Sequence, residues 1–284
     1  MDWIERLNAA MAYIEENLTG EIRYEEAAKI ACCSVFHFQR MFSYMAGIPL
    51  GEYIRRRRMT KAAQELRDKN AKVTDIALKY GYDSPTAFNR AFQGIHGIAP
   101  SKVRRDGVSL KAFPVISFKI TIKGEAEMDY RIEEHPAFSI VGISAPMSRT
   151  IEENFAVVPK LWERAAKEGI IPRLVKLMTG EPKGMLGVSC CNSQEEWRYF
   201  IAAAGEGDGS QDLQTYQVPA CTWAIFPGQG PMPQSIQELE KRIVTEWLPS
   251  SGYEYANAPD IEVYISPDPA RAKYEVWLPI TPKK

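Results

Sequence analysis

The segment KYEVWLPI, residues 273–280, places a single carboxylate in a stretch that otherwise reads as one mostly apolar β-strand. Side chains alternate between the two faces of a strand, so Glu275 and Trp277 share one face. A carboxylate there lies either at a solvated sheet edge, paired with Lys273 or Arg271, or in a pocket. Burial of an unpaired carboxylate is costly, whereas aromatic rings attract cations. We favour a pocket, in which Glu275 and Trp277 bind a cationic or polarisable aromatic molecule.

Side chains that can read DNA bases occur in two similar segments, SVFHFQRMFSYMAG (34–47) and SPTAFNRAFQGIHG (84–97). Each opens with a serine suited to cap a helix, with Asp83 as the alternative cap in the second, contains a Phe-x3-Phe spacing, and ends at a glycine. Each also follows a shorter predicted helix and a tight turn, so the pattern predicts two helix-turn-helix units. Arginine bonds guanine bidentately, which makes Arg40 and Arg90 the strongest candidates for base contacts.

A predicted helix of about 20 residues, roughly 30 Å long, joins the two units over residues 50–70. Recognition helices held that far apart can enter successive major grooves, which are spaced by roughly 34 Å. The helix carries four consecutive arginines, residues 55–58. They form either a solvated face or contacts with DNA phosphates, and we expect phosphate contacts from Arg55 and Arg57.

The motifs RMTKAAQEL and VTDIALKYGYDSPTAFNRAFQGIHGIAP resemble the signature of the AraC/XylS transcription regulators, and HFQRMF resembles the first recognition helix of their Rob-type branch. The resemblance covers about residues 1–107. It implies base-reading positions on both recognition helices, with core packing as the alternative for Phe36; the positions are Phe36, Gln39, Arg40, Thr86, Asn89 and Arg90. Pro85 departs from the polar residues common in that branch, which leaves the target sequence open.

Charge divides the chain in a way that fits two different partners. Residues 1–107 contain 17 Lys and Arg against 13 Asp and Glu, while residues 108–284 contain 18 against 23. The basic half is therefore the candidate for double-stranded DNA. No stretch resembles a membrane span or a secretory signal, so we expect a cytoplasmic protein without a membrane partner. No metal-ligand cluster or phosphate-binding loop occurs, and we expect no cofactor.

The second half changes to a strand-rich pattern. Residues 128–205 predict strand, strand, helix, strand, strand, and residues 213–280 predict the same order again. Two such repeats, related by a pseudo-twofold axis, would leave a cleft for a small molecule at their junction. The predicted fold is therefore an all-α N-terminal domain (1–107), a linker (108–125) and an α+β C-terminal domain (126–284).

The C-terminal half resembles the GyrI-like effector-binding domain over about residues 126–282, through its doubled element order and the segments ACTWAIFPGQG and YEVWLPI. In multidrug-responsive relatives, a glutamate on the last strand lies in an aromatic pocket and pairs with lipophilic cations. The resemblance places Glu275 on that position, with Trp277 beside it and Trp223 and Tyr264 as possible walls; for Trp223, core packing is the equal alternative.

These features predict a ligand-responsive transcription factor that activates promoters, with RNA polymerase as a further partner. We expect binding rather than catalysis. The alternative is a GyrI-like hydrolase fused to a DNA-binding domain, in which Glu275 acts as a general base beside Trp223 or Trp277. A third alternative is a protein-binding domain whose cleft is filled by side chains.

Overall fold

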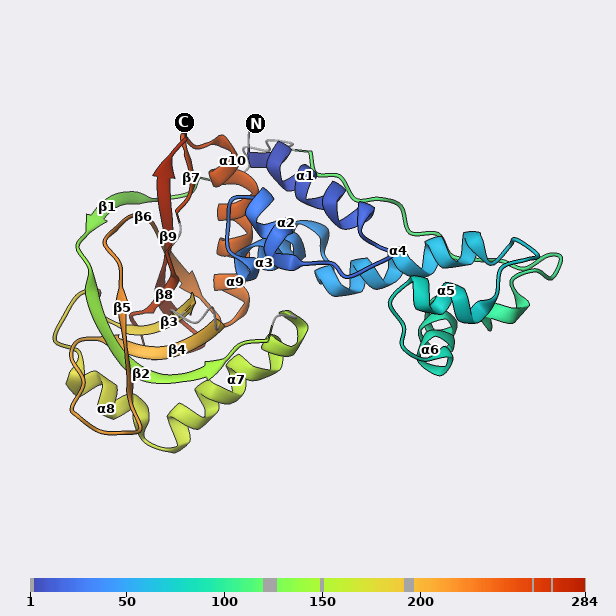
Figure 1. Ribbon diagram of the computed structural model, residues 1–284. Helices are drawn as coiled ribbons and strands as arrows, with labels where there is room; N and C mark the ends of the chain where they lie inside the picture. The colour runs from blue at the N-terminus through green and yellow to red at the C-terminus, as the bar shows by residue number, and fades with distance from the viewer. Residues whose placement is uncertain are drawn as a thin grey trace. The chain divides into compact units, whose positions relative to one another are not determined.

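The computed structural model describes residues 3–119, 127–148, 151–191, 197–256, 258–266 and 268–283. Within these ranges, the side chains of Phe36, of residues 151–153, 155 and 156, and of Cys191 lie outside the description. The chain forms two compact units, Met1–Lys119 and Ile120–Lys284, shown as ribbons in Figure 1. Each has a hydrophobic core of its own. Among the described residues, no helix combines the length and apolar character needed to cross a membrane.

The first unit is helical, as predicted. Its elements are α1 (Trp3–Glu16), α2 (Tyr24–Ile30), α3 (Val35–Ala46), α4 (Leu50–Glu65), α5 (Val73–Lys79), α6 (Pro85–His96) and the short 3-10 helix η1 (Pro100–Lys102). Two pairs of short helices, α2–α3 and α5–α6, thus flank α4 in the sequence. The phenylalanines of both Phe-x3-Phe motifs are fully buried and pack in the core of this unit.

Helices α3 and α6 begin and end in the same way. The side chains of Ser34 and Ser84 each accept a hydrogen bond from the backbone N–H three residues later, at 3.2 and 3.1 Å. Such a cap satisfies a donor that the first helical turn leaves unpaired. Gly47 and Gly97 end the helices with φ of 69° and 74°, the left-handed region that glycine adopts without strain. The predicted caps are confirmed for both helices.

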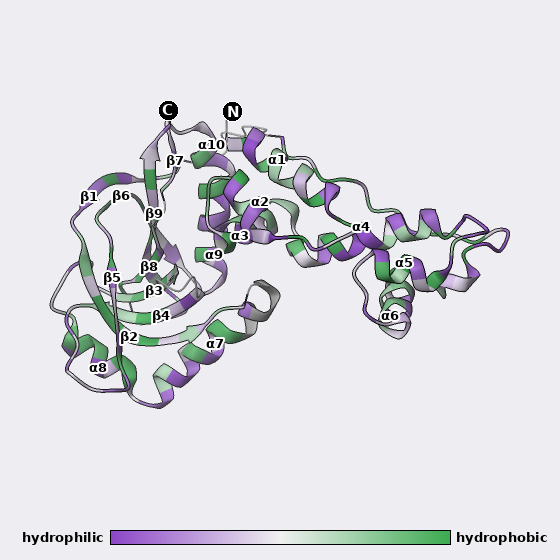
Figure 2. Cartoon of the chain, viewed as in Figure 1, coloured by the Kyte–Doolittle hydropathy of each residue, from purple (hydrophilic) through white to green (hydrophobic). Residues whose placement is uncertain are grey.

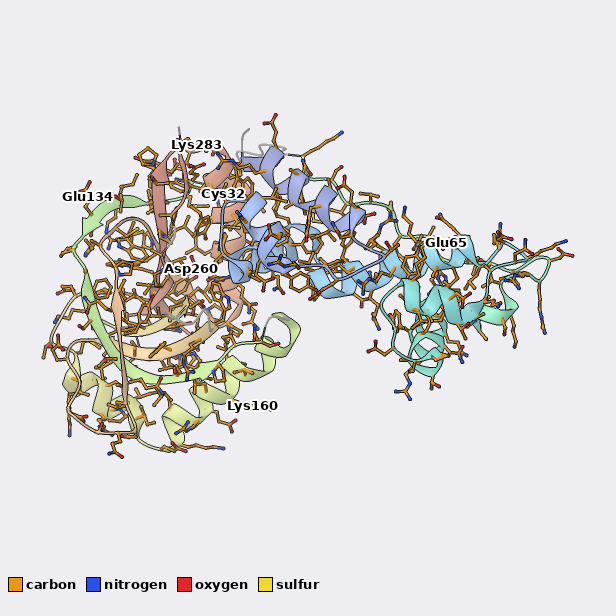
Figure 3. The ribbon with its side chains drawn as sticks, in the orientation of Figure 1. Cys32, Glu65, Glu134, Lys160, Asp260 and Lys283 are labelled. Atoms are coloured by element: carbon orange, nitrogen blue, oxygen red, sulfur yellow. The ribbon has the colours of Figure 1, made fainter. Side chains whose placement is uncertain are left out.

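Helix α4 is shorter than predicted. It ends at Glu65, labelled in Figure 3, rather than near residue 70. Arg104 donates hydrogen bonds to the carbonyl oxygens of Leu66, at 3.0 Å, and of Ala71, and thereby satisfies backbone acceptors beyond the helix end. The 16 residues of α4 span about 24 Å.

Residues 108–119, predicted to be part of a linker, belong to the first unit. Their backbone is hydrogen-bonded to side chains of the helices: Phe113 N–H donates to Thr60 Oγ1 at 3.1 Å, and Phe118 N–H donates to Asn8 Oδ1 at 2.8 Å. The rest of the predicted linker, residues 120–125, lies outside the described residues.

The second unit is built on an antiparallel sheet with helices. Its strands are β1 (Arg131–His135), β2 (Phe138–Pro146), β3 (Met185–Cys191), β4 (Trp197–Ala204), β5 (Gln214–Val218), β6 (Cys221–Gly230), β7 (Tyr253–Tyr255), β8 (Asp260–Tyr264) and β9 (Ala272–Pro282). Its helices are α7 (Ile151–Lys167), α8 (Ile170–Leu177), α9 (Gln234–Arg242), the π-helical segment η2 (Ile243–Trp247) and α10 (Leu248–Ser250). The strand order is β1-β6-β9-β8-β3-β4-β2-β5, and β7 also pairs with β9.

The strand holding Glu275 is therefore central in the sheet, because β9 lies between β6 and β8. The predicted strands and main helices are present, while α8 and β7 were not predicted. Pro159 lies inside α7 without ending it. Figure 2 shows the hydrophobic residues of α7 alternating with hydrophilic ones, as expected of a helix that packs one side on a sheet.

The two faces of the sheet bury different residues. One face, here called the tryptophan face, carries Trp223 and Trp277 among aliphatic residues of β2, β3, β4, β6 and β8. The opposite face, here called the helix face, carries Tyr199 and aliphatic residues of β2 and β4 against α7 and α8. The register pairs Ile261 with Trp277 and Val263 with Glu275, so Glu275 projects from the tryptophan face and Glu262 from the helix face.

Candidate functional site

Glu275 is held by an arginine on β1. Arg131 donates to both carboxylate oxygens, from Nη1 at 2.7 Å and from Nη2 at 3.0 Å, and its Nε donates to Glu133 at 2.7 Å. Hydrogen bonding to Glu275 is the main cause that raises the pKa of Arg131. The Trp277 indole N–H adds a third bond to Glu275 at 2.8 Å. The carboxylate is thus half-buried and paired, but with Arg131 rather than with Lys273 or Arg271.

Aromatic rings surround this pair on the tryptophan face. The ring of Trp277 lies 4.8 Å from that of His135 and 5.8 Å from that of Trp223, between ring centroids. Trp223 is fully buried, and its indole N–H has no hydrogen-bond partner among the described residues. The structure therefore brings together three of the four predicted ligand residues, Glu275, Trp277 and Trp223. Their contact with a ligand stays a prediction.

Tyr264, the fourth predicted residue, lies on the helix face beside a carboxylate that the sequence reasoning missed. Tyr264 Oη donates to Glu262 Oε2 at 2.7 Å, and Tyr199 Oη donates to the same oxygen at 3.2 Å. Trp162 of α7 donates its indole N–H to Tyr199 Oη at 3.2 Å. The Trp162 ring also meets the Tyr264 ring edge to face, with centroids 5.1 Å apart. Three aromatic side chains thus gather around one carboxylate.

A glycine makes this arrangement possible. Gly187 of β3 pairs with Glu262, and a Cβ atom there would lie 2.3 Å from Tyr199 Oη and 2.8 Å from Glu262 Oε2. Any larger residue would push the phenol and the carboxylate apart. On α7, Lys160, labelled in Figure 3, is exposed two residues before Trp162, about 200° around the helix. The side of α7 that carries Trp162 accordingly faces the sheet.

The electrostatics keep both phenols protonated. Burial, and next the negative charge of Glu262, raise the pKa of Tyr199 and of Tyr264 well above the usual value. Both therefore act as neutral hydrogen-bond donors near neutral pH. Glu262 is half-buried, so the site remains partly accessible to solvent. A carboxylate with neutral donors and aromatic walls suits a cation that carries apolar groups.

The sequence did contain a signal for this site. Glu262 and Tyr264 are two residues apart on one strand, as are Glu275 and Trp277, so each pair shares a strand face. The spacing of an acid and an aromatic residue thus marks both carboxylates. Tyr199 and Trp162 carried no such signal, because they come from other elements, β4 and α7.

The candidate nucleic-acid contacts of α6 lie on its exposed side. Thr86, Asn89 and Arg90 are all exposed, opposite the buried phenylalanines of the same helix. Gln93, one turn after Asn89, donates its amide N–H to Asn89 Oδ1 at 3.0 Å. These positions are those predicted for base reading, and their contact with DNA stays a prediction.

The residues predicted on α3 lie in more enclosed surroundings. Arg40 is half-buried and donates from Nε to Tyr44 Oη at 3.2 Å. Gln39 is only 3% exposed, although a base-reading position requires an exposed side chain, and its contact with DNA stays a prediction. It lies about 100° from Phe38, at the border of the buried side of the helix, where a pattern cannot assign the face. The side chain of Phe36 lies outside the described residues.

The run of four arginines makes intramolecular contacts rather than a free basic patch. Arg57 is buried and bonds both carboxylate oxygens of Glu15, from Nε at 2.8 Å and Nη2 at 2.7 Å, an arrangement that does not favour its predicted phosphate contact. Arg58 donates to backbone carbonyls after α1. Arg55 is exposed and shares Glu52 with Arg56. Of the predicted phosphate contacts, Arg55 remains available.

Known proteins resemble both units. A family model described as a GyrI-like small molecule binding domain matches residues 128–281, and a model described as a helix-turn-helix domain matches residues 27–106. The HTH-type transcriptional activator AarP of Providencia stuartii is 43% identical over 98 residues, which cover 34% of this chain and 73% of AarP. The multiple antibiotic resistance protein MarA of Escherichia coli is 34% identical over 98 residues, covering 34% of this chain and 77% of MarA.

Among solved structures, that of the protein SAV2435 bound to tetraphenylphosphonium is similar to part of this chain. It has a TM-score of 0.47 and 21% sequence identity, and the match covers 54% of this chain and 94% of SAV2435.

Proposed function

The chain belongs to the AraC family of transcriptional regulators and carries a C-terminal GyrI-like small-molecule-binding domain, and we propose that it activates promoters in response to a lipophilic cationic or aromatic effector. The similarity to the transcriptional activator AarP supports activation. We also propose RNA polymerase as a further partner and the cytoplasm as the place of action. A DNA-binding unit gives a bound ligand an output, so we propose that the second unit senses its ligand without turning it over.

We assign DNA reading to two helix-turn-helix units, α2–α3 and α5–α6. In this proposal Arg40 and Arg90 bond guanine, and Thr86 and Asn89 contact neighbouring bases. Helix α4 spans about 24 Å of the roughly 34 Å between successive major grooves, and the helices that flank it extend the span. A base contact by Gln39 requires its side chain to turn outward from its buried position.

We assign effector binding to Glu262, in the second of two related strand and helix repeats. The observation that carries this proposal is that Tyr199 and Tyr264 both bond one carboxylate over Gly187, while Trp162 bonds Tyr199 and packs against Tyr264. A cation with aromatic substituents would pair with the carboxylate and pack against the rings.

At Glu275, a cationic ligand would meet an existing ion pair. A ligand would have to displace Arg131, which bonds both carboxylate oxygens and would then lose two charge-assisted hydrogen bonds. At Glu262, Tyr264 and Tyr199 are neutral donors, and their rings would pack against the apolar groups of a cation. The sequence-based choice of Glu275 thus gives way to Glu262 in this proposal.

Titration with tetraphenylphosphonium, followed by tryptophan fluorescence, tests this assignment. We expect saturable quenching in the wild-type chain, because Trp162 lies at the site. Glu262→Gln should weaken binding by about tenfold or more, since it removes a partly desolvated charge contact. Glu275→Gln is the matched control and should bind as the wild type does. Loss of binding in Glu275→Gln alone would instead place the ligand on the tryptophan face.

A further inference from the structure

Residues 110–118 form an extended segment, here called the strap, that is hydrogen-bonded along the first unit. At its start, Lys111 N–H donates to His96 Nδ1 at 3.2 Å. In its middle, Phe113 N–H donates to Thr60 Oγ1 at 3.1 Å, and Ile116 N–H donates to Tyr53 Oη at 3.3 Å. At its end, both backbone groups of Phe118 bond the amide of Asn8, at 2.8 and 3.0 Å.

The strap contacts both candidate recognition helices. His96 belongs to the last turn of α6, and its other ring nitrogen lies 3.1 Å from the carbonyl oxygen of Met59 on α4. At the other end, the ring of Phe118 meets the ring of Phe42 on α3 edge to face, with centroids 5.9 Å apart. A single extended segment thus connects α6, α4 and α3.

The strap explains why polar side chains are buried in this unit. Thr60 and His96 are 5% and 6% exposed, and each bonds a backbone N–H of the strap. The third such side chain is Arg57, which donates from Nη1 to the carbonyl oxygen of Phe113. If the strap left, these groups would lose partners in a buried environment, which is unfavourable. These buried side chains therefore hold the strap in place.

The strap and α4 match in length. Tyr53 and Thr60 are seven residues apart on α4, or about 10.5 Å along the helix axis. Their partners, Ile116 and Phe113, are three residues apart in the strap, or about 10 Å of extended chain. The two segments run antiparallel with this common spacing, so stretching or shifting one against the other breaks hydrogen bonds at several points together.

We propose that the strap is a positioning element that fixes the separation of the two recognition helices, and therefore the half-site spacing that the chain reads on DNA. This inference rests on the proposed DNA-binding function. Phe118 lies one residue before the end of the first unit. The strap is therefore also the last segment of the DNA-reading part before the chain continues into the ligand-binding part.

The test measures spacing preference rather than affinity alone. Sites are first selected by the wild-type full-length chain from a random-sequence DNA pool. Binding is then measured to the selected site and to versions with one base pair inserted or removed between the half-sites. We expect the affinity of the wild type for the altered spacings to be lower by about tenfold or more, because a displaced recognition helix loses base contacts that contribute about this much to affinity.

The variant Asn8→Ala removes both hydrogen bonds to Phe118, and Thr60→Val removes the hydrogen bond from Phe113. We expect them to bind the selected site and the altered sites with nearly equal affinity. Asn17→Ala and Thr74→Val are matched controls, because their side chains bond Tyr13 and Asp75 within their own local segments and should leave the preference unchanged. Circular dichroism checks that all variants are folded.

The outcomes separate the two proposals. If both strap variants keep the wild-type spacing preference, or lose affinity equally for every spacing, the strap has only a structural role and the inference is overturned. A wild type that binds the selected DNA without any spacing preference overturns it too. Failure of the wild type to select any DNA would overturn the proposed function itself, and the inference with it.

Discussion

Substitution of Arg57 by methionine tests whether the arginine run stabilises the fold rather than contacting DNA. Methionine keeps much of the apolar stem but removes the two bonds to Glu15 and the bond to the carbonyl oxygen of Phe113. Glu15 would keep its bond from Tyr53, at 2.7 Å, but would lose its cationic partner. Breaking a buried ion pair from one side typically costs about 3–5 kcal/mol, and both side chains here are less than a fifth exposed.

Urea denaturation followed by far-ultraviolet circular dichroism measures this loss. Arg57→Met should lower the free energy of unfolding by about 3–5 kcal/mol. Arg55→Met is the control, because Arg55 is exposed and its loss should change stability by no more than about 0.5 kcal/mol. A loss below about 1 kcal/mol for Arg57→Met would refute the reasoning and return Arg57 to the candidate phosphate contacts.

The Glu15–Arg57 pair also predicts how the stability of the protein depends on pH. Burial raises the pKa of Glu15, but hydrogen bonds from Arg57 and Tyr53 outweigh that effect and leave the pKa below its usual value of 4.5. A lowered folded-state pKa contributes stability that is fully present above 4.5 and is lost as the pH falls through the folded value. We expect the acid sensitivity from this source to be absent in Arg57→Met, and an unchanged acid profile would contradict the assignment.

Two further predictions concern single positions. Gly187→Ala should abolish saturable tetraphenylphosphonium quenching, because its Cβ would collide with Tyr199 and Glu262. Gly94→Ala is the control and should bind normally, because the space around its Cβ is open. Unchanged binding in Gly187→Ala would contradict the site. Burial, which outweighs the bond to Met59, lowers the pKa of His96 below 6.5, and the facing charge of Lys111 lowers it further. The stability that His96 contributes should therefore be fully present above pH 6.5 and decline as the pH falls below that value. His96→Gln should remove this decline, as measured by urea denaturation across this pH range. A decline that persists in the variant would refute the prediction.

Much of the fold could be predicted because local sequence determines it. Capping serines, terminal glycines and the spacing of the phenylalanines set the ends and the buried side of α3 and α6. Alternation placed Glu275 and Trp277 on one face of β9, and the register confirms it. The end of α4 was missed because Arg104, which bonds the carbonyls after it, lies 38 residues beyond Leu66.

The partners of the charged residues could not be predicted, because they depend on which strands and helices meet. Arg131 lies 144 residues before Glu275, and Glu15 lies 42 residues before Arg57. A run of four arginines looks alike in sequence whether it faces solvent or a buried glutamate. The spacing of Glu262 and Tyr264 was a local signal, but Tyr199 and Trp162, which complete the surroundings, come from β4 and α7 and could not be placed from a local pattern.

The central claim is that a small molecule bound to the second unit changes what the first unit does on DNA. Transcription by purified RNA polymerase from a promoter that carries a selected site, measured with and without tetraphenylphosphonium, tests it most directly. The account predicts that the wild-type chain raises transcript levels when the cation is added, and that Glu262→Gln binds the promoter but gives no rise. A wild type that binds the cation saturably and leaves transcription unchanged would contradict the account.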